Sequence, residues 1–142
     1  MTNEIKQIAL DQFNRLNAGD IAGAAALFAE DCVNHAALPS AQGRAGFETL
    51  QGKLRTAFPD VRYTVEDTLV DGDKVLVRLT VNATHKGTLA MRPGQAISPT
   101  GVAVTFEQMH LLRIAGGRIV EYWMNMDSAA LQRQLGLKVV QG

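Results

Sequence analysis

The spacing of the apolar residues changes at Pro59. Before it, Phe47, Leu50, Leu54 and Phe58 recur at helical intervals, and the proline ends that helix. After it, apolar and polar residues alternate over several runs, as they do in half-buried strands. Helices followed by a run of antiparallel strands are typical of an α+β fold with the helices on one face of the sheet. We therefore expect a strongly curved antiparallel sheet, closed by N-terminal helices into a cone that encloses a pocket.

Local signals set the boundaries of the expected elements. Asn17-Ala18-Gly19 ends the first helix, Asp20 caps the second, Ser128 caps the last, and Gly136 ends it. Residues 87–101 contain two prolines and are expected to form a loop over the mouth of the pocket. The expected elements are helices over 5–16, 21–28 and 44–58, an extended segment over 30–38, strands over 62–70, 74–85, 102–114 and 118–126, and a short helix over 129–135.

Length and composition limit the class of protein. The 142 residues are enough for one domain with its own core, so 1–142 is treated as a single domain. The 14 Lys and Arg balance the 14 Asp and Glu, which gives no electrostatic basis for binding nucleic acid or an anionic membrane. The lone Cys32 excludes an intrachain disulfide and is interpreted as a packing residue. Because the sequence shows neither a signal peptide nor an apolar run of roughly 20 residues, we expect a cytoplasmic protein.

Two polar residues interrupt the apolar side of the strand over 102–114. Alternation places Gln108 and His110 on the same face as Phe106, Leu112 and Ile114. Polar side chains among large apolar ones need a partner, a water molecule or a ligand. The sequence leaves two interpretations open, namely a pair of satisfied core residues and the polar wall of a pocket.

The turn at Gly116-Gly117 decides which residues of the last two strands face each other. A two-residue turn sets His110 opposite Trp123, whereas a type I turn with a glycine bulge at Gly117 sets it opposite Tyr122. We favour the bulged turn, which also sets Gln108 opposite Met124.

The bulged register divides the hairpin into two faces. Met124 and Met126 then join Tyr122, Gln108 and His110 as an adaptable wall for a flat apolar ligand. Trp123 lies on the opposite face, where an apolar surface favours a homodimer.

Seven motifs in order resemble those of one known family. They are FNRLNAGD at 13–20, LFAEDCVNHAALP at 27–39, GRAGFETLQGKLRTAFPDVRYTVED at 43–67, ATHKG at 83–87, PTG at 99–101, FEQMHLLRIAGGRIVEYW at 106–123 and LQRQLG at 131–136. Together they cover nearly the whole chain. The chain resembles the SnoaL-like polyketide cyclases, or ester cyclases, of the nuclear transport factor 2-like superfamily.

This resemblance implies both an architecture and a chemistry. The family fold is a cone-shaped α+β barrel with a deep pocket, which assembles into a homodimer or homotetramer through the sheet. Its cyclases perform an intramolecular aldol condensation on a polyketide ester without a metal or an organic cofactor. An acidic residue moves the proton, and polar side chains that match Asn34, Gln108 and His110 surround the substrate.

The sequence departs from the family at the acid. The resemblance places the cyclase aspartate at Met124, and a thioether cannot carry a proton at neutral pH. Asp127 is nearby in sequence but is interpreted as a residue that leads into, and helps to cap, the last helix. His110 is therefore the expected proton carrier because its ordinary pKa of about 6.5 suits transfer near neutrality, and Gln108 is expected to steady an enolate oxygen. The expected substrate-binding residues are Asn34, His35, Phe13, Phe106, Tyr122, Met124, Met126 and Met91.

Two functions remain open from the sequence. The first is a cofactor-free cyclase, isomerase or lyase, and the second is non-catalytic binding of a small apolar molecule, such as a polyketide or an aromatic compound. Gln108 and His110 favour the first and Met124 favours the second. The three histidines are not spaced as metal ligands, and no Asp-Arg-Asp set of the limonene epoxide hydrolase type is present.

Overall fold

The computed structural model describes residues 2–35, 42–92 and 95–137. Four helices and seven strands follow one another within these ranges. In chain order they are α1 (Thr2–Asn17), α2 (Ile21–Ala25), β1 (Phe28–Asn34), α3 (Gly43–Ala57), β2 (Arg62–Asp71), β3 (Lys74–Thr84), β4 (Leu89–Arg92), β5 (Gln95–Ile97), β6 (Ala103–Ala115), β7 (Arg118–Met126) and α4 (Ser128–Gln134).

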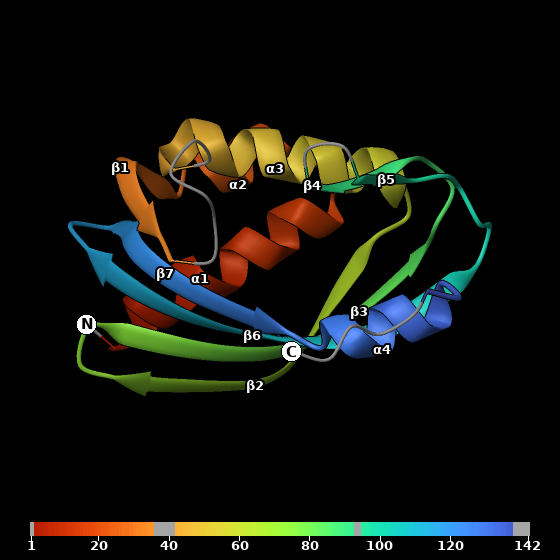
Figure 1. Ribbon diagram of the computed structural model, residues 1–142. Helices are drawn as coiled ribbons and strands as arrows, with labels where there is room; N and C mark the ends of the chain where they lie inside the picture. Colours follow the sequence, from red (N-terminus) through yellow and green to blue (C-terminus); the bar gives the residue numbers. More distant parts are fainter. Residues whose placement is uncertain (1, 36–41, 93–94, 138–142) are drawn as a thin grey trace.

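Five strands form one curved sheet in the order β1-β7-β6-β3-β2 (Figure 1). β1 runs parallel to β7, and the other neighbours are antiparallel. The α+β class and the curved sheet confirm the expectation from the sequence. The strands form no closed barrel, because β1 and β2 are opposite edges of this sheet and do not pair. As expected, the helices close the concave side of the sheet (Figure 1).

Helices fill the concave side of the sheet. α1 crosses this side beneath α3, and it contacts β2, β3 and β7 (Figure 1). Ala9, Phe13 and Leu16 form the buried stripe of α1 and are at most 1% exposed. They face an apolar inner surface of β3, where Val75, Val77, Leu79 and Val81 alternate with exposed or half-buried residues. Burial of these facing apolar surfaces is the main source of the fold's stability.

Amide side chains pair with free backbone groups at one residue on each of three described strands. Asn17 at the end of α1 pairs with both backbone groups of Tyr63 on the edge strand β2, at 2.7 Å for each bond. Gln42 does the same for Asn34 on the edge strand β1, also at 2.7 Å. Gln134 of α4 pairs with Thr105 of β6, beyond the point where β7 has ended. Each amide replaces the donor and the acceptor of a missing strand, which satisfies the edge without extending the sheet.

Three expected elements differ from the structure. The second helix ends at Ala25 rather than Phe28, because Phe28 begins β1 and stacks on Phe47 of α3 at a ring-centroid distance of 4.2 Å. The expected loop 87–101 contains the short hairpin β4–β5. Asp127 rather than Ser128 caps α4, since the Asp127 carboxylate accepts a hydrogen bond from Ala130 N at 3.0 Å.

The expected register of the last hairpin is also wrong. Gly116 and Gly117 both have positive φ, at 59° and 77°, so they form a two-residue turn of the kind that tight hairpins favour. The extra residue is Val120 in β7, because Ile114 pairs with Ile119 whereas Arg113 pairs with Glu121. Relative to a regular two-residue hairpin, the bulge at Val120 shifts the partner of His110 from Trp123 to Met124. The bulge expected at Gly117 would have shifted it the other way, to Tyr122.

The corrected register places His110 opposite Met124, Gln108 opposite Met126 and Leu112 opposite Tyr122. The displacement from the expected pairing is two residues, so each side chain stays on its expected face. Both residues opposite the polar pair are methionines, and the acid that the resemblance places on this strand is missing in either register.

Candidate functional site

A cavity of about 70 Å³ lies between α1, α3 and the inner face of the sheet. Most of its lining is apolar or aromatic, and several amide side chains interrupt it. The lining residues are Gln12, Phe13 and Leu16 of α1, Asn34 of β1, Phe47, Leu50, Gln51 and Leu54 of α3, Tyr63 of β2, Gln108 and His110 of β6, and Tyr122 and Met124 of β7. No Asp or Glu belongs to this described lining.

His110 and Gln108 form a buried pair on the cavity wall, and each is 8% exposed. His110 Nε2 lies 2.9 Å from Gln108 Oε1. The carbonyl oxygen accepts, so Nε2 carries the proton and Nδ1 holds the lone pair. Nδ1 has no hydrogen-bond partner among the described residues. The ring of Phe13 meets the imidazole edge-on at a centroid distance of 5.1 Å, which fixes the ring between helix and sheet.

Burial lowers the pKa of His110 from 6.5 to about 4. Desolvation disfavours the charged imidazolium, and no carboxylate on the cavity wall offsets it. The expectation that His110 titrates near neutrality is therefore wrong. At pH 7 the imidazole is neutral and in its proton-accepting form.

The two tyrosines of the cavity are neutral hydrogen-bonding groups. Burial raises the pKa of Tyr63 to about 12. Burial also raises the pKa of Tyr122, with a smaller contribution from Cys32 and an opposing one from a hydrogen bond with Asn34. Neither phenol supplies a base at neutral pH. His110 is thus the one side chain of the described lining that presents a basic lone pair at neutral pH, and burial makes it a weak base.

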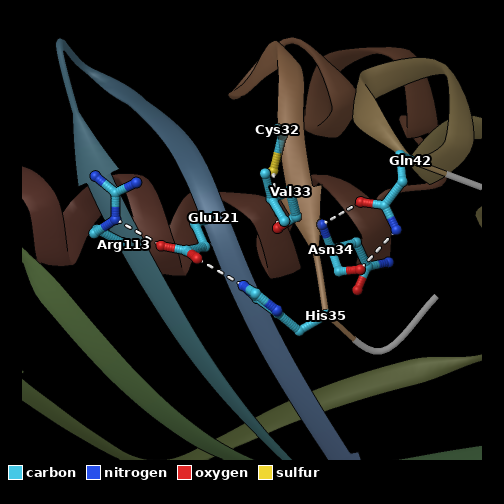
Figure 2. A network of polar contacts seen from close by, with 7 residues as sticks. All are labelled: Cys32, Val33, Asn34, His35, Gln42, Arg113 and Glu121. Carbon is cyan, nitrogen blue, oxygen red and sulfur yellow. Dashed lines mark hydrogen bonds and ion pairs between the residues drawn. The ribbon is translucent and has the colours of Figure 1, made fainter. Parts of the chain in front are cut away.

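Asn34 is positioned by the amide of Gln42. Figure 2 shows the Gln42 side chain across from Asn34, where it pairs with the backbone N and O of that residue. Gln42 directly precedes α3, so this contact ties the end of β1 to the start of the helix. The Asn34 side chain is thereby held on the cavity side of β1, beside Tyr122.

His35 lies on the other face of the sheet, contrary to its expected role in binding substrate. It follows Asn34 in the chain, and successive residues of an extended segment point to opposite faces. Its ring stacks on Trp123 at 4.6 Å with an interplanar angle of 4°, and its Nε2 lies 2.6 Å from Glu121 Oε2. Glu121 also accepts from Arg113 Nε at 2.8 Å (Figure 2). This group belongs to the outer surface.

The structure brings together six of the residues expected at the site. Phe13, Asn34, Gln108, His110, Tyr122 and Met124 line the cavity. Phe106 and Met126 point to the inner side of the sheet but lie outside the cavity lining, since Phe106 belongs to the core and Met126 is half-buried at the end of β7. The Met91 side chain lies outside the described residues.

Sequence reasoning missed seven lining residues, namely Gln12 and Leu16 of α1, Tyr63 of β2, and Phe47, Leu50, Gln51 and Leu54 of α3. Leu50, Gln51 and Leu54 were placed on a helix, but nothing local connects that helix to the polar pair of β6. Gln12 left a readable signal. It falls on the apolar stripe of α1 at helical spacing from Ile5, Ala9 and Leu16, where a polar residue is unexpected.

His85 and Cys32 lie away from the cavity lining. His85 is fully buried, and its Nδ1 contacts Thr100 Oγ1 at 2.9 Å and Thr100 N at 3.2 Å. These bonds join the two ends of the segment between β3 and β6. Burial raises the pKa of the Cys32 thiol to about 12, which leaves it unreactive as a nucleophile.

Two kinds of feature are absent from the described residues. No three His, Cys, Asp or Glu side chains are grouped as metal ligands. None of the described helices has the length and apolar character needed to cross a membrane.

Comparisons with known proteins agree with this architecture. The family model of the SnoaL-like polyketide cyclases matches residues 7–135. AclR from Streptomyces galilaeus, assigned as a hydroxylase, is 28% identical with a TM-score of 0.81, over 96% of this chain and 98% of that one. IdmH from Streptomyces antibioticus, assigned as a polyketide cyclase, is 26% identical with a TM-score of 0.77, over 94% and 99%. TsrD from Streptomyces laurentii, at 21% identity and a TM-score of 0.85 over 97% and 98%, shares the fold.

We find no significant match among the curated proteins. The chain belongs to the SnoaL-like polyketide cyclase family.

Proposed function

We propose that this protein binds a small, largely apolar carbonyl compound of the polyketide type and promotes an intramolecular aldol cyclisation. His110 is the proton carrier and no cofactor takes part. The observation that carries the proposal is a neutral imidazole on the cavity wall whose Nδ1 has no partner among the described residues. IdmH, assigned as a polyketide cyclase, supports the reaction class.

The lowered pKa makes His110 a substitute for a carboxylate. An imidazole with a pKa of about 4 has nearly the proton affinity of an ordinary aspartate, whose pKa is about 3.9. Unlike aspartate, it is uncharged in its base form, so it needs no counter-ion in an apolar cavity. His110 thus supplies on β6 the function that the family aspartate supplies on β7, directly across from Met124.

The proposed reaction conserves its protons. Nδ1 removes a proton from the carbon next to a substrate carbonyl, and the enolate carbon attacks a second carbonyl of the same molecule. The resulting alkoxide takes the proton back from the imidazolium. Gln108 accepts from Nε2–H throughout, and its NH₂ group donates to the enolate oxygen.

The cavity must widen to admit a substrate of this kind. Its volume of about 70 Å³ is well below the roughly 300 Å³ at which ligand pockets begin. Met124 and the α3 side chains Leu50 and Leu54 form the adaptable part of the lining. Methionine changes rotamer at little cost, so Met124 is the side chain best suited to move.

Non-catalytic binding is the second candidate. It is favoured by the absence of Asp and Glu from the described cavity lining and by Met124 opposite His110. An apolar ligand would then occupy the widened cavity without losing a proton.

Turnover of a polyketide methyl ester separates the two candidates. We expect His110→Ala to lower the rate by about 10²- to 10⁴-fold, the usual contribution of general acid–base catalysis, while a flat aromatic ligand still binds. His35→Ala removes a histidine from the outer face and is the matched control, with an unchanged rate. Equal turnover by wild type and His110→Ala would make the histidine structural. Tight ligand binding without turnover of any carbonyl compound would establish the binding function.

We also infer that the chain forms a homodimer through its outer sheet face. Cross-strand pairing places one apolar row across the sheet, which we call the outer row. It consists of Leu69, Leu76, Leu111 and Trp123, and the ring of His35 stacks on its last member. Leu69 is 65% exposed, and Met109 in the next row is 49% exposed. A continuous apolar row on a sheet surface is a common site of association.

A further inference from the structure

Gln12 is a buried polar residue with an incomplete set of hydrogen bonds. It is 2% exposed and lies on the apolar stripe of α1 between Ala9, Phe13 and Leu16. Its Oε1 has no partner among the described residues. A buried amide in this state costs stability, and a leucine at the same helical position would remove that cost. The fold therefore gives no reason for a glutamine here.

The unpaired atoms gather at the cavity. Among the described residues, three buried side-chain atoms lack a hydrogen-bond partner, namely Gln12 Oε1, His110 Nδ1 and His85 Nε2. Gln12 and His110 both line the cavity, one from α1 and the other from β6, whereas His85 lies elsewhere. Two unpaired polar groups in the lining of one largely apolar cavity indicate a ligand group that binds both.

The chemistry of the two groups identifies that ligand group. His110 donates through Nε2 to Gln108, so its Nδ1 accepts and needs a donor. A bare carbonyl has no hydrogen to give. In the structure the unpaired atom of Gln12 is its acceptor, Oε1. A half-turn of the amide exchanges Oε1 and the NH₂ group, and a hydroxyl then gives its hydrogen to Nδ1 and accepts through its oxygen from that NH₂ group. Both residues line the same cavity of about 70 Å³, which places them near any one group bound there.

We propose that Gln12 is a ligand-recognition residue which, with His110, binds a hydroxyl group carried by an otherwise apolar ligand. The class comprises enols and phenols, and it includes the enol form of the polyketide substrate. This inference rests on the proposed function for its site but not on catalysis. Gln12 then donates a hydrogen bond to the hydroxyl oxygen, and His110 Nδ1 accepts the hydroxyl hydrogen.

The test compares phenol with toluene, which has the same shape but carries a methyl group in place of the hydroxyl. NMR titration gives the affinity of each compound for the wild type, for Gln12→Leu and for Gln7→Leu. Gln7 lies on the exposed side of α1, so Gln7→Leu is the same substitution on the same helix without contact with the cavity.

We expect Gln12→Leu to weaken phenol by about 3- to 10-fold, the usual worth of a hydrogen bond, and to leave toluene equally or more tightly bound. Gln7→Leu keeps both affinities. Gln12→Leu should also melt no lower than wild type, because it removes a buried amide without full pairing. Gln12→Met is a second variant with the same expected shift, should the leucine variant fold poorly.

An unchanged phenol-to-toluene ratio in both Gln12 variants would overturn the proposal and leave the proposed function intact. A lower melting temperature with that unchanged ratio would identify Gln12 as a structural residue. Failure of the wild type to bind either compound would overturn the cavity as a ligand site, and the proposed function with it.

Discussion

The inner and outer faces of the sheet around β6 and β7 place two histidines in opposite environments. On the inner face, His110 is buried beside an amide and two methionine positions, and burial lowers its pKa to about 4. On the outer face, His35 pairs with Glu121, which also binds Arg113 (Figure 2). Arg113 lowers the pKa of Glu121, with a smaller effect from His35. A residue's place in the alternation of a strand thus decides whether it meets water and charge or an apolar cavity.

The two faces also differ in what they contribute to the stability of the fold. The charged pairs of the outer face are at least partly exposed to solvent, which screens them, so each adds little to stability. The inner face holds polar atoms without partners, which lowers stability in the absence of a ligand. A site that costs stability and a surface that contributes little are what one expects where a fold carries a binding function.

The largest effect is expected from restoring an acid to the inner face. Met124→Asp places a carboxylate directly opposite His110, where it provides a proton carrier and raises the histidine pKa. We expect turnover of a polyketide methyl ester to rise by about 10²-fold or more. Met109→Asp puts the same substitution on the outer face and should leave the rate unchanged. Equal rates in both variants would show that position 124 does not face the reacting carbon.

The next effect concerns stability against pH. Unfolded His110 takes up a proton below pH 6.5, whereas the folded residue does so only below about 4, so stability falls as the pH drops through this interval. The difference corresponds to about 3 kcal/mol at about 1.4 kcal/mol per pKa unit. Urea unfolding of the wild type should lose this amount between pH 7 and pH 4. His110→Gln should lack this component; parallel curves for the two proteins would refute it.

A charge in the outer row tests association. Leu111→Glu places a carboxylate at the middle of the row, between Leu76 and Trp123. Light scattering at micromolar concentration should report a dimer for wild type and a monomer for this variant. Gln7→Glu adds the same charge on the exposed side of α1 and should remain dimeric. A monomeric wild type would remove the claim.

The smallest effect lies where β7 ends. Asp127→Ala removes the cap of α4 and should lower the free energy of unfolding by about 1 kcal/mol. Turnover should be unchanged, because Asp127 does not line the cavity. Thermal unfolding beside Ser128→Ala, which should cost less, checks the assignment. A loss of turnover in Asp127→Ala at intact stability would make this residue a catalytic candidate.

Alternation along the strands predicted the inner face correctly, because the face of a strand residue depends only on parity. Gln108, His110, Tyr122 and Met124 therefore fell on their expected side although the register was wrong. The register itself depended on whether the extra residue lay at Gly117 or at Val120. Both choices satisfy the turn locally, and only packing against β1 and the helices decides between them.

Other features of the site depend on contacts between distant segments. The pKa of His110 reflects burial by α1, which no neighbour in sequence reveals. Whether the sheet closes into a barrel could not be predicted, because the pattern of each strand does not show whether the two edges of the sheet meet. Gln12 was visible as a polar residue on an apolar stripe, and only the cavity gave that position a meaning.

The protonation state of His110 tests the central claim most directly. Nitrogen-15 NMR of the imidazole, followed from pH 7 to pH 3.5, reports the tautomer and the titration midpoint. The account predicts Nε2–H with an unprotonated Nδ1 at pH 7, and a midpoint near pH 4. A midpoint near 6.5, or a proton on Nδ1 at pH 7, would contradict it.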